Sequence, residues 1–203
     1  MTTSSKQQKG YPRVRVKRKT GAEKFVGSLA SGALMNFWQW STSDLVNNST
    51  RGVLAEYIVA IALGIAEGVR EPWKAYDLDY NGVKIEVKSA AYLQSWYHAE
   101  LSKIIFPIPQ TVNWDSDTNK QSKDKKRRAN IYVFCVLDHT DKDSLDPLNL
   151  DQWTFYILPV DRLNRSSKFR HAKSIGFKSL LDLNPSKTDF EGMKNAIDRL
   201  CCQ

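Results

Sequence analysis

The pair Asn81-Gly82, set between two short runs of alternating apolar and polar residues, constrains the fold of this chain most strongly. Asn-Gly is the strongest short-range signal for a two-residue turn between antiparallel strands. The pattern therefore predicts a β-hairpin over residues 76–88, in which Asp77 lies directly opposite Glu86. The other expected cross-strand pairs are Tyr80 with Val83 and Asp79 with Lys84.

The predicted hairpin has one apolar face and one charged face, because side chains alternate between the two faces of a strand. The apolar face, which we expect to meet the core, carries Leu78, Val83, Ile85 and Val87. The charged face carries Asp77, Asp79, Lys84, Glu86 and Lys88. Two carboxylates that face each other across a ribbon repel. A divalent cation between Asp77 and Glu86 would convert that repulsion into a binding site, with Lys88 beside it.

The net charge of +8 is concentrated in a basic N-terminal arm. Residues 1–28 contain eight Lys or Arg residues and a single acidic residue, Glu23, so the rest of the chain is nearly neutral. Basic tails commonly bind phosphates without reading sequence, and the alternative is a tail that only keeps the chain soluble. A second basic cluster lies within residues 120–128. The residues expected to contact nucleic acid are Arg13, Arg15, Lys17, Arg18, Lys19, Lys125, Lys126, Arg127 and Arg128.

Composition excludes several classes of protein. Hydrophobic residues make up 41% of the 203 residues and include six Trp, which indicates a packed core. The chain has no run of about 18 apolar residues and no apolar signal core at its start, so we expect no membrane association. Its three cysteines, Cys135, Cys201 and Cys202, lack the spacing of a disulfide framework. We therefore expect a reducing, cytoplasmic compartment.

The order of apolar segments predicts an α/β (or α+β) domain over residues 28–203, preceded by a disordered basic arm over residues 1–27. We expect a central mixed β-sheet of about five strands flanked by helices, and a mobile basic loop near residues 109–129. Strands are predicted in the hairpin and at 104–108, 131–137 and 153–160. Helical segments are predicted at 28–40, from Ser49 or Thr50 to Leu63, at 89–96, at 177–183 and at 190–201.

Aromatic residues near the predicted helices are expected to pack inside. The run Phe37-Trp38-Gln39-Trp40 has a spacing that favours a place in the core over a base-stacking role. Trp73 and Trp96 flank the hairpin and are expected to cover the sheet.

Glu56 is the only charged residue of the predicted helix between Val53 and Leu63. Its neighbours one turn away are apolar residues and a glycine, so it does not belong to a polar stripe. Burying an unpaired carboxylate costs several kcal/mol. Glu56 therefore either faces a bound cation or forms an ion pair, with Arg51 or with a lysine elsewhere.

The combination of Glu56 in an early helix, Asp77 before the hairpin turn and Glu86-Val87-Lys88 on the following strand resembles the motif of the PD-(D/E)XK nuclease superfamily. That superfamily includes many restriction endonucleases and the archaeal Holliday-junction resolvases. The resemblance covers residues 51–96, less than a quarter of the chain, and Tyr76 stands where many members have Pro. It implies a restriction-endonuclease-like core.

The resemblance also implies a Mg²⁺-dependent endonuclease that hydrolyses phosphodiester bonds in DNA, with Mn²⁺ as a substitute. Lys88 would orient the attacking water or stabilise the phosphorane, and Gln94 resembles a glutamine that some members place on the next helix near the scissile phosphate. Many double-strand cutters of the superfamily are dimers, which makes a homodimer an expectation here. The implied metal ligands are Asp77, Glu86, Glu56 and the backbone carbonyl of Val87.

Three alternatives stay open. Asp79 could replace Asp77 as the ligand, although its place opposite Lys84 favours a cross-strand ion pair. The fold could serve as a catalytically inactive nucleic-acid-binding module. Finally, the protein could be structural or partner-binding, with Glu56, Asp77, Glu86 and Lys88 forming a buried ion network.

Overall fold

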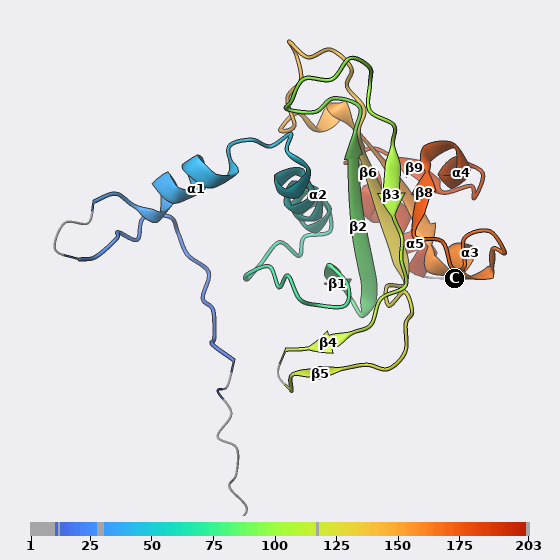
Figure 1. The fold of residues 1–203 in the computed structure, drawn as a ribbon, viewed down its shortest axis with the longest axis horizontal. Coiled ribbons are helices and arrows are strands. Elements are labelled where there is room, and N and C mark those ends of the chain that lie inside the picture. Colours follow the sequence, from blue (N-terminus) through green and yellow to red (C-terminus); the bar gives the residue numbers. More distant parts are fainter. Residues whose placement is uncertain (1–10, 12, 28–30, 117, 202–203) are drawn as a thin grey trace, which may run out of the picture.

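A mixed five-stranded β-sheet forms the centre of the fold, as the sequence predicts (Figure 1). The structure is a computed structural model that describes residues 11, 13–27, 31–116 and 118–201. β2 runs parallel to β6, and the other neighbouring strands are antiparallel. In spatial order the strands are β1 (Leu78–Tyr80), β2 (Val83–Ala91), β6 (Ile131–Leu137), β7 (Trp153–Pro159) and β9 (Ser186–Thr188).

The predicted hairpin turn is confirmed. Asn81 and Gly82 have φ values of 52° and 84°, the left-handed backbone that a two-residue hairpin turn requires. The strands pair Tyr80 with Val83, Asp79 with Lys84 and Leu78 with Ile85. Pairing ends there, so β1 is only three residues long and Asp77 lies just outside the ladder.

Helices and a small ribbon cover the two faces of the sheet (Figure 1). On one face, α2 (Asn48–Ala62) and α5 (Met193–Cys201) pack against inward side chains such as Ile85, Val87 and Val133. The other face is covered by a two-stranded ribbon and two short helices, which pack on Tyr132 and Phe134. These elements are β3 (Ile105–Pro107), β8 (Ser174–Gly176), α3 (Val160–Arg165) and α4 (Phe177–Leu181).

Several element boundaries differ from the sequence prediction. The N-cap of α2 is Asn47, whose side chain accepts a hydrogen bond from the Ser49 N–H at 3.0 Å, and not Ser49 or Thr50. The predicted helical turn at 89–96 is wrong, because β2 continues through Ala91 alongside β6. The strand at 104–108 forms as β3 but belongs to the separate ribbon, and β9 supplies the fifth strand of the sheet instead.

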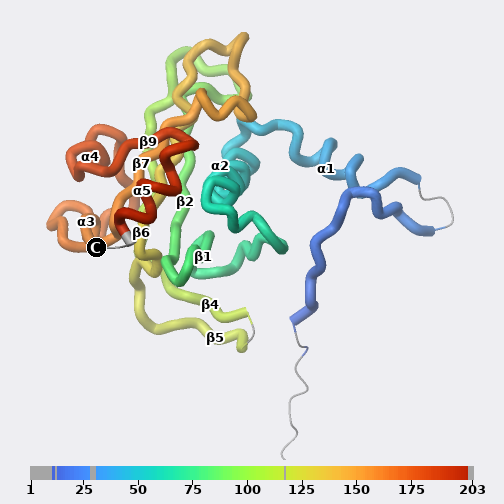
Figure 2. Tube along the Cα trace, turned by 180° about the vertical axis from the view of Figure 1, so that it is seen from behind, coloured from blue at the N-terminus to red at the C-terminus, as the bar shows by residue number. Residues whose placement is uncertain are grey.

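The aromatic helix α1 (Leu34–Thr42) is not part of the core. It has no buried residue, Trp40 is 85% exposed, and the ribbon and tube views both place the helix away from the sheet (Figures 1 and 2). The expectation that Phe37, Trp38 and Trp40 pack inside is therefore wrong. Residues 13–27 of the predicted arm are described and contain no helix. Residues 1–10, 12 and 28–30 of the predicted arm and helix lie outside the described residues.

The predicted basic loop at 109–129 contains a short hairpin of β4 (Trp114–Asp115) and β5 (Lys120–Gln121). A single 3-10 turn, η1 (Leu150–Gln152), precedes β7. Among the described residues, no helix has both the length and the apolar character to cross a membrane.

Candidate active site

Asp77 lies where β1 ends and the edge of β2 becomes open. Its backbone N–H donates to the Ile85 carbonyl at 2.9 Å. Its carboxylate Oδ2 accepts a hydrogen bond from the Val87 N–H at 2.7 Å, so the side chain caps the edge of β2 at the point where no strand pairs with it. The sequence predicted that Asp77 pairs directly with Glu86 across the ladder. In the structure the Asp77 side chain instead contacts the backbone of Val87, the next residue of β2, and this contact still holds the Asp77 carboxylate beside Glu86.

Glu86 and Lys88 extend from β2 toward the sheet face that carries Tyr132. Their side chains form an ion pair, with 2.6 Å between Lys88 Nζ and Glu86 Oε1. About a fifth of each side chain is exposed, 22% for Lys88 and 20% for Glu86. The pair is therefore largely shielded but open to a ligand.

Glu56 reaches the same edge from α2, on the opposite face of the sheet. Its carboxylate receives two hydrogen bonds from Arg70, one of them between Nη2 and Oε1 at 2.6 Å. The expectation that Arg51 pairs with Glu56 is wrong, because Arg51 is buried and donates to the Val46 carbonyl and to Asn48 Oδ1. Burial lowers the pKa of Arg51 to about 10. The sequence indicated an ion pair as one alternative, and gave no signal that Arg70 in the loop after α2 would supply the cation.

The pKa of Asp77 is affected by both of the other acids. Burial, followed by the carboxylates of Glu86 and Glu56, raises the pKa of Asp77 from 3.8 to about 7. The Val87 N–H and the Lys88 ammonium oppose this shift. Burial and the nearby Glu86 carboxylate also raise the pKa of Tyr132. The negative charge of Asp77 is therefore not neutralised by a partner, because Asp77 forms no ion pair within the described residues.

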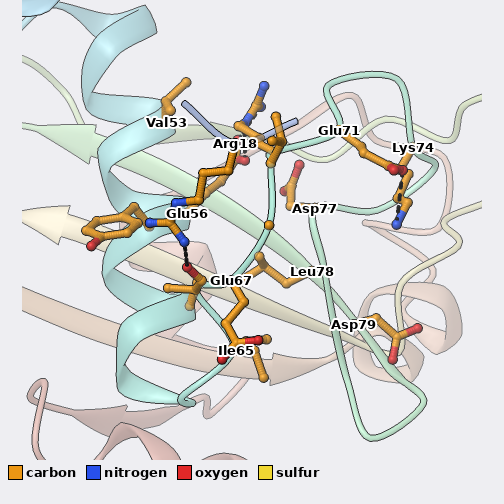
Figure 3. Close-up of a pocket in the computed structure, with 16 residues that line it drawn as sticks. Arg18, Val53, Glu56, Ile65, Glu67, Glu71, Lys74, Asp77, Leu78 and Asp79 are labelled. Carbon is orange, nitrogen blue, oxygen red and sulfur yellow. Dashed lines mark hydrogen bonds and ion pairs between the residues drawn. The ribbon is translucent and has the colours of Figure 1, made fainter. Parts of the chain in front are cut away.

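Asp77 lines two cavities that meet at its side chain. The first, of about 350 Å³, includes Glu56 and Arg70 and lies between α2 and the loop that leads to β1 (Figure 3). The second, of about 390 Å³, includes Glu86 and Lys88 and is bounded by the β4–β5 hairpin. Asp77 therefore borders both cavities.

This donor set suits a hard divalent cation. Mg²⁺ prefers oxygen ligands, uses few carboxylates and keeps several waters. Asp77 and Glu86 offer such oxygens on adjoining positions, and a cation there would relieve the repulsion that raises the pKa of Asp77. In the described residues no group of three acidic, His or Cys side chains is arranged to hold a metal. Glu56 pairs instead with Arg70, and Glu86 with Lys88.

The predicted site residue Gln94 does not join the acids. It lies beyond the C-terminal end of β2, is buried, and donates to the Ala91 carbonyl at 3.1 Å. It lines neither of the two cavities. The helix expected to carry Gln94 is wrong, because β2 continues through Ala91 and residues 92–96 are not helical. A role of Gln94 near the scissile phosphate stays a prediction.

Arg127 has a structural role and is not a surface contact for nucleic acid. It is 7% exposed, and its guanidinium donates to the side chain of Asn164 and to the carbonyls of residues 108, 169, 170 and 172. These bonds use all five N–H groups of the side chain. The prediction of a phosphate contact is wrong for this residue.

The other predicted basic contacts lie at the surface or near the cavities. Arg128 lines the second cavity, Lys126 pairs with Asp124 at 2.9 Å, and Lys125 is exposed. In the arm, Arg13 pairs with Glu71 at 3.3 Å, and Arg18 lines the first cavity while donating to the Ala66 carbonyl at 3.1 Å. Exposed positions in the same extended segment are Arg15, Lys17 and Lys19.

The comparison with protein families identifies the chain. A family model described as Bacteriophage T4 endonuclease IV matches residues 21–175, about three quarters of the sequence. The chain belongs to this family. The part matched to the endonuclease IV family contains the four predicted site residues Glu56, Asp77, Glu86 and Lys88, and begins after the basic residues 13–19. No curated protein and no solved structure matches the chain.

Proposed function

We propose that this member of the endonuclease IV family is a Mg²⁺-dependent endonuclease that hydrolyses phosphodiester bonds in DNA at the edge of β2. The observation that carries the proposal is the hydrogen bond from the Val87 N–H to Asp77, which fixes this acid beside Glu86 and Lys88. The same arrangement supports a PD-(D/E)XK type of site on a restriction-endonuclease-like core. The family name supports nuclease chemistry independently of that resemblance.

In this proposal Asp77, Glu86 and the Val87 carbonyl hold the metal, and Glu56 binds it directly or through water. When bound, Mg²⁺ would offset charge on the phosphate and lower the pKa of a water molecule. The chain's own contribution is to orient these oxygens. The Val87 N–H fixes Asp77 in position, and β2 fixes Glu86 and Lys88 by its pairing with β6.

Lys88 and Arg70 would become available to bind phosphate if the acids with which they pair bound a metal. Lys88 now pairs with Glu86, and its ammonium would then be free to hold a phosphate oxygen or the attacking water. Arg70 now pairs with Glu56, and its planar guanidinium would be free to bind a second phosphate oxygen. The ion pairs thus keep two phosphate-binding groups next to the acids.

Substrate binding outside the site would rely on backbone contacts. Arg128 lines the second cavity, and Lys125 and Lys126 precede it closely in the sequence. In the arm, Arg18 lines the first cavity and Arg13 pairs with Glu71. Such contacts position a nucleic acid without reading its sequence. A homodimer remains a prediction, to be checked by sedimentation.

Cleavage assays test the proposal. Plasmid and branched DNA are incubated with Mg²⁺, with Mn²⁺ or with EDTA, using the wild-type protein, Asp77→Ala and Lys88→Ala. We expect cutting only with metal, and a loss of roughly 100-fold or more in each variant. Lys84→Ala is the matched control, since Lys84 lies on the same face of β2 outside both cavities and should leave cutting unchanged. Cutting in EDTA, or full activity of Asp77→Ala, would refute the proposal.

The two ion pairs favour a second candidate function. If Glu56–Arg70 and Glu86–Lys88 only hold the fold together, the protein is a nucleic-acid-binding module or a partner-binding protein without catalysis. In that case Lys88→Ala should lower the melting temperature markedly, and added Mg²⁺ should not raise the melting temperature of the wild type. DNA binding without cutting under every metal would identify the module.

A further inference from the structure

Two tryptophans that are distant in sequence meet at the mouth of the second cavity. The ring centroids of Trp73 and Trp114 are 6.0 Å apart and the rings are inclined by 77°. Trp73 is 72% exposed and Trp114 is 38% exposed. The expectation that Trp73 covers the sheet is therefore wrong, and this aromatic surface has no partner that buries it within the described residues.

Both rings lie beside the proposed catalytic acids. Trp73 belongs to the loop that leads to Asp77, and Trp114 belongs to β4. The Trp114 indole N–H donates to Asn119 Oδ1 at 3.0 Å, which anchors the ring within the β4–β5 hairpin. The two tryptophans line the same cavity of about 390 Å³ as Asp77, Glu86, Lys88 and Arg128.

The chemistry of this cavity favours one kind of ligand. Large aromatic side chains are usually buried because they carry much apolar surface, so an exposed pair in a cavity indicates a flat apolar ligand. Lys88 and Arg128 in the same cavity supply positive charge for a phosphate. A nucleotide has both features: a base with a π-face for stacking and a phosphate for the cations.

We propose that Trp73 and Trp114 bind an unpaired nucleobase next to the phosphate that is cut. The base must be unpaired, because a base inside a duplex is already stacked on both faces and presents only its edges in the grooves. This inference rests on the proposed function, since it places the phosphate at Asp77, Glu86 and Lys88. It adds the element that would hold the strand beside these residues.

The alternative is that the two tryptophans bind no ligand and have a structural role. The Trp73–Trp114 contact could simply fasten the loop before β1 to the β4–β5 hairpin. A binding measurement without metal separates the two, because no cleavage occurs and stacking is read directly. Trp73 is the better position to change, since most of its side chain is exposed and its removal should leave the fold intact.

The experiment measures anisotropy of labelled oligonucleotides in EDTA. The probes are a single-stranded thymidine oligonucleotide, an abasic strand of equal length and charge, and a duplex. Trp73→Ala should weaken binding of the thymidine strand by roughly 5- to 100-fold, and leave binding of the abasic strand and of the duplex unchanged. Trp73→Phe should restore part of the loss, because it retains a smaller aromatic face.

Trp96→Ala is the matched control. Trp96 is likewise exposed, at 50%, but lines neither cavity, so its removal should not affect any probe. Equal losses on the thymidine and abasic strands, or no loss on either, would overturn the inference. The two proposals fail separately: a Trp73 effect on the thymidine strand in a wild-type protein that cuts no DNA with Mg²⁺ or Mn²⁺ would refute the proposed function while retaining the base-binding pair.

Discussion

Replacing Asp77 by Asn should stabilise the metal-free protein at alkaline pH. The pKa of Asp77 is raised from 3.8 to about 7 by burial and by the carboxylates of Glu86 and Glu56. Asn removes the negative charge, and its side-chain oxygen can still accept the hydrogen bond from the Val87 N–H. The variant therefore separates the electrostatic cost of this acid from its role in the backbone contact.

The size of the effect follows from linkage between protonation and folding. A shift of about three pKa units corresponds to roughly 4 kcal/mol, which is an upper bound for a group coupled to other acids. Well below its ordinary pKa of 3.8, Asp77 is protonated in both the folded and the unfolded chain and costs nothing. As the pH rises from about 4 to about 7, only the unfolded chain loses the proton, so the free energy of unfolding of the wild type falls relative to Asp77→Asn.

Urea unfolding in EDTA at about pH 4 and about pH 8 measures this difference. We expect Asp77→Asn and wild type to be similar at the lower pH, and the variant to be more stable by roughly 2–4 kcal/mol at the higher pH. Asp143→Asn, a change at an exposed loop carboxylate, is the matched control and should show no such dependence. A variant that is less stable at alkaline pH, or a difference that does not change with pH, would refute the idea that burial and the neighbouring acids raise the pKa of Asp77.

Two further predictions concern the basic residues. Arg127→Met should lower the melting temperature by several degrees, because it leaves buried carbonyls without their donors. Lys125→Met, at an exposed position, should not lower it. Equal melting temperatures of the two variants in a thermal scan would contradict the structural role of Arg127. Deleting residues 1–20 should flatten the slope of log affinity for DNA against log salt concentration by about 0.7–0.9 for each phosphate contact that is lost. An unchanged slope would mean that the arm does not contact DNA.

The features that sequence predicted well depend on local chemistry. The Asn81-Gly82 turn and the alternation after it set the strand register, and the same register places Ile85 and Val87 in the core. Continuous β-branched and aromatic segments located β6 and β7 because both strands are buried on both faces. The isolation of Glu56 in an apolar helix correctly indicated that this acid needs a cation.

The features that sequence missed depend on contacts between distant segments. The partner of Glu56 is Arg70, 14 residues away in a loop without periodicity. Arg127 belongs to a run of basic residues, and only the three-dimensional packing distinguishes it from its exposed neighbour Lys126. No local pattern shows that Trp73 meets a hairpin some forty positions further along the chain.

Titration calorimetry with Mn²⁺ above pH 7 tests the central claim most directly, because it measures whether Asp77 and Glu86 together form a cation site. The account predicts that wild type and Asp143→Asn bind Mn²⁺, and that Asp77→Asn and Glu86→Gln each lose this binding while remaining folded. Mn²⁺ affinity that is the same in Asp77→Asn as in the wild type would contradict it.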